Sequence, residues 1–155
     1  MQVFRIVTRR HLAGAFSGEG ARLHGGRWNP KGVATVYTAA NRSLALLEML
    51  VQDEPLRARY WIVPAEVPDA LEIEHVDPAK LPTDWRERLD ITRRIGSTWA
   101  ERASTAVLAV PSTVLRAETN FVLNPRHPSF PRIRIGRPSE LDTDLRLLRK
   151  PGAEP

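Results

Sequence analysis

One stretch of the chain, residues 20–51, concentrates the residue types that could carry out chemistry. Glycine allows backbone N–H groups to approach a ligand closely, and arginine binds phosphate oxygens through two parallel hydrogen bonds. The first part of the stretch mixes four of the nine glycines with basic side chains: Gly20, Arg22, His24, Gly25, Gly26, Arg27, Lys31 and Gly32. This composition predicts an anion-binding loop. A surface turn built from Gly, Asn and Pro is the alternative.

The second part of this stretch predicts a helix over about residues 42–52 that carries one acid. Asn41 is a candidate N-cap, and Leu44, Leu47 and Val51 recur at the spacing of one helix face, which Glu48 shares. A carboxylate among apolar residues must pair, take up a proton or line a cavity, because burial of an unpaired charge is very costly. Glu48 is therefore the best single candidate for a catalytic residue. A structural ion pair, or a place at the helix rim, is the alternative.

The length and composition limit what this chain can be. A chain of 155 residues fits one domain, which we expect over residues 1–150 with its core at about 2–137, followed by a short tail at 151–155. The absence of cysteine excludes disulfides, zinc–cysteine clusters and thiol catalysis. The first residues have the pattern of neither a signal peptide nor a membrane span. We therefore expect a cytoplasmic protein without membrane contact.

The formal net charge of +5 arises from 20 arginines and three lysines set against 18 acids. Such a balance suits an anionic partner, whether a nucleic acid, a nucleotide or an acidic protein surface. The arginines are scattered through the chain and do not form a run. The charge therefore permits an anionic ligand without identifying one.

The remaining sequence predicts strands with few helices. Aromatic and β-branched runs predict strands at 2–8, 33–39, 106–110, 120–123, 132–136 and 145–148, and a hairpin formed by 59–67 and 70–75. Residues 77–87 predict a loop with a helical turn near Trp85, and 89–103 predict a helix with a weak point or break at Gly96. Strands and helices without regular alternation predict an α+β domain with a largely antiparallel sheet. A Rossmann fold is disfavoured, because the glycines do not follow its GxGxxG pattern.

The side chains available restrict the chemistry. The four histidines lie far apart and show no metal-ligand spacing, so we predict no metal site; His127 is the one most suited to face a site. The other candidates are Arg27 in the glycine loop, Tyr37 on a strand, Glu48 on the helix and Ser112 at a strand end. This set suits a substrate with phosphates, a flat ring and ribose hydroxyls that reacts through a cationic transition state. Cleavage of the nicotinamide–ribose bond of NAD+ meets all of these requirements.

Five segments of the chain, taken in order, resemble the RES domain family. They are GGRWN at Gly25–Asn29, VYTA at Val36–Ala39, SLALLE at Ser43–Glu48, VPS at Val110–Ser112 and ETNFVLNPRHP at Glu118–Pro128. The resemblance covers about residues 2–137 and implies a fold related to the ADP-ribosyltransferases. It also implies the toxin of a bacterial RES–Xre toxin–antitoxin pair. Members of the family consume NAD+ by phosphorolysis or hydrolysis, or by ADP-ribosylation of a protein.

The resemblance also implies roles for individual residues. The family's catalytic positions fall on Arg27, Tyr37, Glu48 and Ser112, and Asn124 belongs to the last motif. The expected NAD+-binding residues are Arg22, Gly26, Arg27, Tyr37, Asn120 and His127. We expect no resident cofactor, with NAD+ as substrate and inorganic phosphate as a candidate co-substrate. The implied partner is an Xre-type helix-turn-helix antitoxin that occludes the active site. Whether the protein forms a homodimer is left undecided by the sequence, and no direct DNA binding is expected.

Two other functions remain open at this point. The first is transfer of ADP-ribose to a specific protein, which differs only in the nucleophile that reaches the same ribosyl carbon. The second is a basic nucleic-acid-binding module or a ribonuclease-type toxin, which the net charge and Trp28 beside Arg27 permit. The scattered arginines and the lack of a histidine pair for RNA cleavage disfavour this second function.

Overall fold

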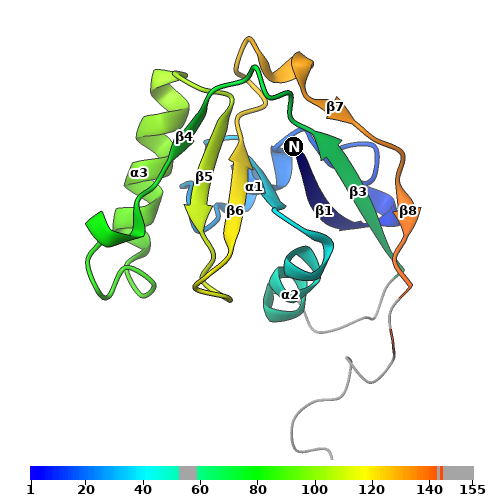
Figure 1. Ribbon diagram of the computed structural model, residues 1–155, viewed down its shortest axis with the longest axis horizontal. Helices are drawn as coiled ribbons and strands as arrows, with labels where there is room; N and C mark the ends of the chain where they lie inside the picture. Colours follow the sequence, from blue (N-terminus) through cyan, green and yellow to red (C-terminus); the bar gives the residue numbers. More distant parts are fainter. Residues whose placement is uncertain (53–58, 143, 145–155) are drawn as a thin grey trace, which may run out of the picture.

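The computed structural model describes residues 1–52, 59–142 and 144, and its centre is a single sheet flanked by helices (Figure 1). In the described residues the sheet has eight strands in the order β4-β5-β6-β2-β1-β3-β7, with β8 also beside β3. Their bounds are β1 Gln2–Thr8, β2 Val36–Ala39, β3 Tyr60–Glu66, β4 Ile73–His75, β5 Val107–Pro111, β6 Thr119–Leu123, β7 Arg134–Ile135 and β8 Ser139–Glu140. The helices are α1 (Glu19–His24), α2 (Arg42–Gln52) and α3 (Leu89–Arg102), and 3-10 turns occur at Arg9–His11, Pro78–Lys80 and Phe130–Arg132.

The middle of the sheet is covered on both faces. All five residues of β5 are buried, which explains its continuous apolar sequence. Val107 joins the larger core cluster, whereas Leu108 packs with Trp28 and Trp99 in a second cluster. Because neighbouring residues of a strand point to opposite faces, the two clusters lie on opposite sides of the sheet. Helix α3, which contributes the fully buried Trp99, covers the second face.

Helix α2 is fixed to the sheet through its first turn. The side chain of Asn41 accepts a hydrogen bond from the backbone N–H of Leu44 at 2.8 Å, which confirms the predicted N-cap. Leu44 and Ala45 are buried against Phe4 of β1 and its neighbours. Val51, expected on the same apolar face, is 63% exposed. The second half of α2 therefore projects beyond the sheet.

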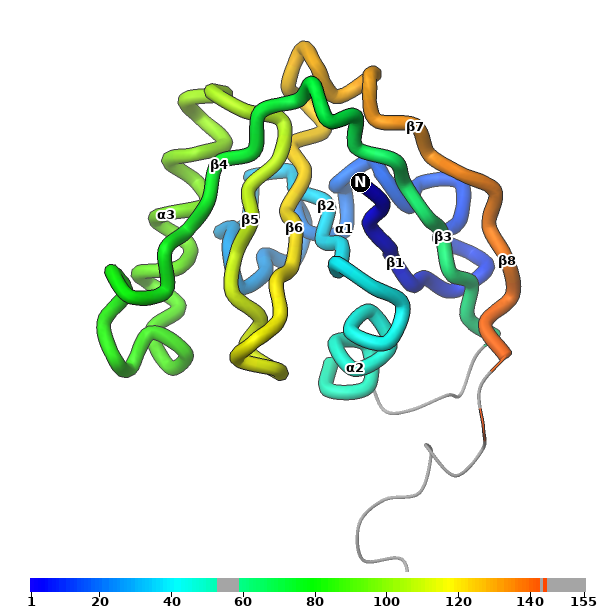
Figure 2. Tube along the Cα trace, viewed as in Figure 1, coloured from blue at the N-terminus to red at the C-terminus, as the bar shows by residue number. Residues whose placement is uncertain are grey.

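The sheet opens between β1 and β2. These strands share the single pair Phe4↔Ala39, whereas β1 and β3 pair along seven residues. Figure 2 shows the chain traces of β1 with β3 on one side and β6 with β5 on the other. The side chain of Arg5 crosses this opening, where its Nη1 donates to the backbone carbonyl of Tyr37 at 2.8 Å.

Strand pairing differs from the prediction in one main respect. The predicted hairpin of residues 59–67 and 70–75 is wrong, because β4 pairs in parallel with β5, starting at Ile73↔Val107. Both edges of β3 are already occupied, by β1 on one side and by β7 and β8 on the other. The chain therefore turns at Pro68, whose carbonyl accepts from the N–H of Leu71, and continues to the far end of the sheet.

The boundaries of several other helices and strands also differ from the prediction. Part of the predicted loop over residues 20–32 is helical, since α1 begins at Glu19, just after Gly18 in a left-handed conformation (φ 73°). Helix α3 continues through Gly96 without the predicted break. The predicted strand at 132–136 is shorter in the structure, where it is β7 and follows the 3-10 turn Phe130–Arg132. The predicted strand at 145–148 and the tail at 151–155 lie outside the described residues.

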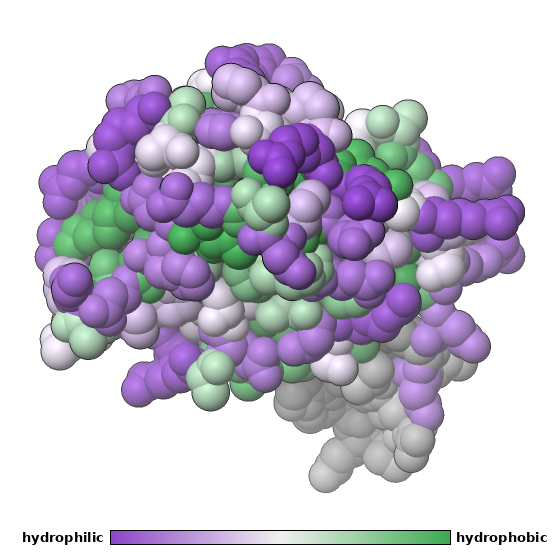
Figure 3. Space-filling model, turned by 45° about the horizontal axis from the view of Figure 1, so that its top comes forward, coloured by the Kyte–Doolittle hydropathy of each residue, from purple (hydrophilic) through white to green (hydrophobic). Residues whose placement is uncertain are grey.

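The view in Figure 3 shows a surface on which hydrophilic residues separate smaller apolar patches. Large apolar side chains that are more than half exposed include Leu23, Val51 and Ile135, which come from three different elements. In the part of the chain that is described, no helix has the length and apolar character needed to cross a membrane.

Candidate active site

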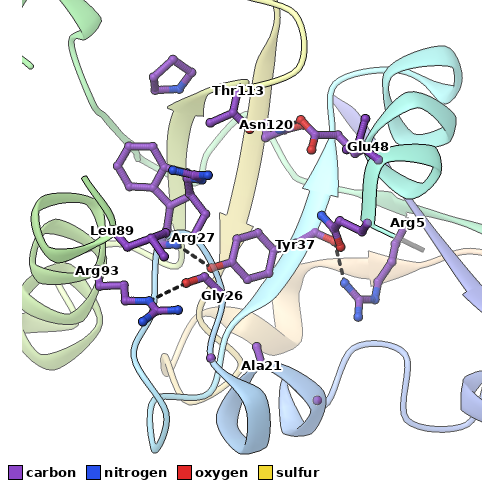
Figure 4. A pocket seen from close by; sticks show the side chains of 16 residues that line it. Arg5, Ala21, Gly26, Arg27, Tyr37, Glu48, Leu89, Arg93, Thr113 and Asn120 are labelled. Carbon is purple, nitrogen blue, oxygen red and sulfur yellow. Dashed lines mark hydrogen bonds between the residues drawn. The ribbon is translucent and has the colours of Figure 1, made fainter. Parts of the chain in front are cut away.

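A cavity of about 490 Å³ lies where the sheet opens, a volume typical of small-molecule sites (Figure 4). Strands, the helices α1, α2 and α3, and the non-helical residues 25–32, here called the glycine loop, contribute to its walls. The lining residues are Arg5, Gly20, Ala21, Gly25, Gly26, Arg27, Trp28, Tyr37, Glu48, Val51, Gln52, Leu89, Arg93, Pro111, Thr113 and Asn120. Segments that are far apart in the sequence thus meet around one space.

Glu48 lines this cavity from the projecting half of α2. Its Oε1 accepts two hydrogen bonds, from Ser112 Oγ at 2.7 Å and from Asn120 Nδ2 at 2.5 Å. Oε2 receives no hydrogen bond from any described residue. The structure therefore supports the prediction that this acid lines a cavity. One carboxylate oxygen is fixed by Ser112 and Asn120, and no described residue occupies the other, which is available to a ligand.

Ser112 stands behind Glu48 and does not line the cavity. Its side chain is completely buried, and Oγ accepts hydrogen bonds from the backbone N–H groups of Val114 and Leu115, both at 3.1 Å. The hydroxyl proton is directed to Glu48. These contacts use the full hydrogen-bonding capacity of the hydroxyl. The position suits a residue that orients Glu48.

The glycine loop is organised around Asn29, a residue whose role the sequence did not reveal. Its side chain is fully buried, and Nδ2 donates to the carbonyls of Ala21 at 2.8 Å, Pro30 at 3.0 Å and Val33 at 2.9 Å. Its Oδ1 accepts from the hydroxyl of Tyr37 at 2.7 Å. An Asn before a proline is typical of a turn, so the sequence carried no signal of burial.

Tyr37 forms the middle of the cavity wall. Its hydroxyl donates to Asn29 and accepts from the backbone N–H of Trp28 at 2.8 Å. Burial raises the pKa of the phenol to about 12, although the hydrogen bonds from the loop oppose this shift. Gly26 passes so close that a Cβ there would lie 2.5 Å from the Tyr37 hydroxyl oxygen. The ring is therefore held neutral and fixed beside the loop.

Among the described residues that line the cavity there are three arginines, and Glu48 is the single acid. Arg27 Nη1 donates to the carbonyl of Arg86, and Arg93 Nε donates to the carbonyl of Gly26 at 2.9 Å. Arg5 is held by the Tyr37 carbonyl, and burial lowers the pKa of its guanidinium. None of the three pairs with a carboxylate of the described residues. The cavity therefore favours an anionic ligand.

Arg5 and Arg93 are not among the site residues predicted from the sequence. Arg5 lies in a strand where one polar residue between apolar neighbours normally faces solvent, and Arg93 lies on the polar side of α3. Only the opening between β1 and β2, and the packing of α3 beside the glycine loop, bring these side chains into one cavity. No local sequence signal could have located them.

Two of the predicted binding residues, Arg22 and His127, do not line the cavity, and neither does Asn124 of the last motif. Arg22 forms an ion pair with Glu19 of α1, at 2.6 Å. His127 lies in the turn after β6, where its Nδ1 accepts from the backbone N–H of Ser129 at 3.0 Å. Asn124 is buried in the same turn and donates to the carbonyl of Ala100. Among the described residues, no three or more His, Asp or Glu side chains form a cluster that could hold a metal ion.

The RES domain model matches residues 2–145. The chain belongs to the RES domain family. This RES domain is 43% identical over 134 residues to a protein named Toxin Res of Yersinia enterocolitica, covering 84% of this chain and 88% of that relative. It is 39% identical over 157 residues to the Prs ADP-ribosylating toxin of a Sphingobium species, covering 95% and 96% of the two chains.

A solved structure is similar over most of the RES domain. A chain of the M. tuberculosis MbcT–MbcA toxin–antitoxin complex superposes with a TM-score of 0.73 and 18% sequence identity, covering 90% of this chain and 83% of that chain. At this identity the likeness concerns the fold. The shared fold and the largely antiparallel sheet confirm the predicted α+β class.

Proposed function

We propose that this RES domain is a toxin that consumes NAD+ by cleaving its nicotinamide–ribose bond, with phosphate or water as acceptor. The observation that carries the proposal is the placement of Glu48 in the same cavity as three arginines that form no ion pair with the described residues. A carboxylate with one oxygen that no described residue binds suits the positive charge that develops on the ribose, and the arginines suit a diphosphate. The membership of a family with relatives named toxins adds support.

The chain's residues divide the work of this reaction. Arg27 and Arg93 bind the diphosphate, beside the backbone of Gly26, and Tyr37 packs against a ring of the substrate. Glu48 accepts a hydrogen bond from a ribose hydroxyl through Oε2 and stabilises the cationic anomeric carbon. As the C–N bond breaks, its electron pair leaves with nicotinamide. An oxygen of phosphate or water then bonds to the same carbon.

Ser112 and Asn120 act on this reaction through Glu48. Their hydrogen bonds both reach Oε1, so they fix the rotation of the carboxylate and leave Oε2 toward the cavity. Fixing a catalytic group before the substrate binds removes the need to reorganise it during the reaction.

The first test identifies the products formed from NAD+. We expect the purified protein to convert NAD+ to nicotinamide and ADP-ribose 1-phosphate when phosphate is present, or to nicotinamide and ADP-ribose in its absence. Glu48→Gln keeps the hydrogen bonds of the side chain but removes its charge, so turnover should fall by at least about 100-fold. Glu101→Gln, at an exposed position of α3, is the matched control. Equal activity of Glu48→Gln and the wild type would remove Glu48 from the mechanism.

ADP-ribosyl transfer to a protein is the second candidate. It is favoured by the 39% identity to a relative that is named an ADP-ribosylating toxin. The chemistry at Glu48 is the same, and the acceptor is a side chain of the target protein. Mass spectrometry of lysate incubated with the protein and labelled NAD+ separates the candidates. A modified protein with little free ADP-ribose or ADP-ribose 1-phosphate would favour transfer.

For the partner, we infer an Xre-type helix-turn-helix antitoxin that covers the cavity. Support comes from the fold shared with a chain of a toxin–antitoxin complex and from the family. Co-expression with a neighbouring helix-turn-helix protein should restore growth, and the purified pair should no longer release nicotinamide. A complex that forms and yet retains full NAD+ turnover would contradict occlusion of the site.

A further inference from the structure

Arg5 holds a donor that no described residue satisfies. Its Nη1 is used by the Tyr37 carbonyl, but its Nε is buried and has no hydrogen-bond partner. A buried polar group without a partner is costly, and more so when it is charged. Such a group in a cavity wall can be satisfied by a ligand that binds there. Because Nε and a terminal nitrogen of a guanidinium can bind two oxygens together, the ligand that suits it is an oxyanion.

Arg5 is separated from the other cavity arginines. In Figure 4, Arg5 lies on one side of the Tyr37 ring, and Arg27 and Arg93 lie on the other. Arg27 lies in the glycine loop, and Arg93 of α3 donates a hydrogen bond to the carbonyl of Gly26 in the same loop. Both guanidinium groups therefore lie beside this loop. Two guanidinium groups beside a glycine loop match the two charges of a diphosphate. Arg5 is then left for a second anion.

The position of Arg5 also relates it to the acid of the site. In Figure 4, Arg5 and Glu48 of α2 lie on the same side of the Tyr37 ring, and both side chains line the cavity. An anion held by Arg5 therefore lies on the side of the cavity that carries Glu48. In the proposed reaction this is the side at which the ribosyl carbon becomes cationic and needs an acceptor.

We propose that Arg5 forms a second anion subsite, on the opposite side of Tyr37 from Arg27 and Arg93, that binds inorganic phosphate as the acceptor. This inference rests on the proposed cleavage of NAD+. A phosphate oxygen bonds to the anomeric carbon as the nicotinamide nitrogen leaves with the electron pair of the C–N bond. The products are nicotinamide and ADP-ribose 1-phosphate. Water, which is uncharged, would gain much less from Arg5 than phosphate does.

The test measures NAD+ turnover while phosphate and NAD+ are varied separately, at constant ionic strength in chloride. Arg5→Lys keeps the charge and a donor for the Tyr37 carbonyl but loses the two-point binding of an oxyanion. In this variant we expect the KM for phosphate to rise about 10-fold or more above the wild-type value, and the KM for NAD+ to rise much less. Arg93→Lys should instead raise the KM for NAD+ more than the KM for phosphate. Arg9→Lys, at an exposed position, is the matched control.

Each outcome separates this inference from the proposed function. NAD+ cleavage by the wild type at a rate that does not depend on phosphate would overturn the phosphate subsite and leave the cleavage intact. A larger effect of Arg5→Lys on the KM for NAD+ than on that for phosphate would assign Arg5 to the dinucleotide. If the wild type cleaves no NAD+ at all, the proposed function and the acceptor role both fail.

A binding measurement without NAD+ covers the remaining cases. Isothermal titration of the wild-type protein with inorganic phosphate should show a site that Arg5→Lys weakens about 10-fold and Arg93→Lys weakens less. Absence of phosphate binding by the wild type would overturn the subsite even if Arg5→Lys fails to fold. Melting temperatures of the variants show whether a loss of turnover comes from a less stable fold, caused by loss of the hydrogen bond from Arg5 to the Tyr37 carbonyl.

Discussion

At the scale of single residues, the site depends on side chains that hold other side chains in place. Glu48 has one oxygen bound by Ser112 and Asn120, and Tyr37 has its hydroxyl bound between Asn29 and the Trp28 N–H. A catalytic group whose rotamer is fixed before the substrate binds needs less reorganisation in the transition state. The residues that provide this fixation should therefore affect turnover without touching the substrate.

Ser112→Ala tests this at Glu48. The change removes a donor to Glu48 and leaves the N–H groups of Val114 and Leu115 without their acceptor, so stability should fall by about 1–3 kcal/mol. The released carboxylate should lower kcat about 10-fold with a smaller effect on KM. Urea unfolding and steady-state kinetics measure the two effects. Ser97→Ala, at an exposed hydroxyl of α3, is the control. An unchanged kcat in Ser112→Ala would contradict the orienting role.

Gly26→Ala tests the close packing of the loop on Tyr37. A Cβ would lie 2.5 Å from the Tyr37 hydroxyl oxygen and 2.7 Å from Asn29 Oδ1, so both must move. We expect a loss of about 1–3 kcal/mol of stability, since overpacking of a fixed environment has this cost. Gly20→Ala is the control, because nothing lies within 4 Å of its Cβ and alanine favours the helix. Equal stability of the two variants would contradict the packing argument.

Part of this site could be predicted from the sequence, and part could not. Glu48 is recognisable because a charge among apolar residues of a helix requires an explanation. Arg5 and Arg93 lie in ordinary polar positions of a strand and a helix, and Asn29 has the sequence pattern of a turn residue. Their roles come from contacts between distant segments, which local spacing does not encode.

At the scale of elements, α3 and the glycine loop are positioned against each other by direct backbone contact. A Cβ on Gly96 would lie 1.7 Å from the carbonyl oxygen of Trp28, so glycine is required there by the approach of the loop. The same contact brings Arg93, one turn earlier in α3, to the Gly26 carbonyl. Glycine in the middle of a helix predicts a weak point, but here the tertiary contact decides its place.

Gly96→Ala should therefore weaken the protein despite the higher helix propensity of alanine, which favours the substitution by about 1 kcal/mol. The loop must move away from α3, so we expect a net loss of stability of at least about 1 kcal/mol and weaker NAD+ binding. Thermal unfolding and the KM for NAD+ measure this. Thr98→Ala, at an exposed position of the same helix, should be neutral. A stabilised Gly96→Ala would show that the loop contact is not required.

The elements themselves follow from the sequence better than their pairing does. The apolar run of β5 and the capped start of α2 are local signals, and both elements formed as predicted. The error at β3 and β4 has a physical cause. Two neighbouring strands linked by a short turn usually pair, but the edges of β3 were taken by β1, β7 and β8. Competition for a strand edge depends on the whole sheet.

At the scale of the whole molecule, the single pair between β1 and β2 leaves the sheet open, and the cavity lies at this opening. Arg5 and Tyr37 join the two halves there, since a guanidinium from β1 binds a carbonyl of β2. Tyr37 connects this opening to the glycine loop through its hydroxyl. The stability of the folded protein should therefore respond to ionisation of this phenol.

Stability should fall as pH rises from about 10 to 12. The folded pKa of Tyr37 is raised to about 12 from the usual 10.0, mainly by burial, so the unfolded chain releases the proton first. The stabilisation, on the order of 2 kcal/mol, is complete below pH 10 and is lost toward pH 12. Urea unfolding at several pH values measures this slope. Tyr37→Phe should show a smaller slope, and an equal slope in that variant would assign the effect to other groups.

The most direct measurement of the central proposal is the release of nicotinamide from NAD+, followed by proton NMR with the purified protein, because this product is common to phosphate, water and protein acceptors. With phosphate and lysate both present, the proposal predicts that the wild type releases nicotinamide in step with the loss of NAD+, and that a folded Glu48→Gln variant does not. Unchanged NAD+ in the wild-type sample, or equal release by Glu48→Gln, would contradict it.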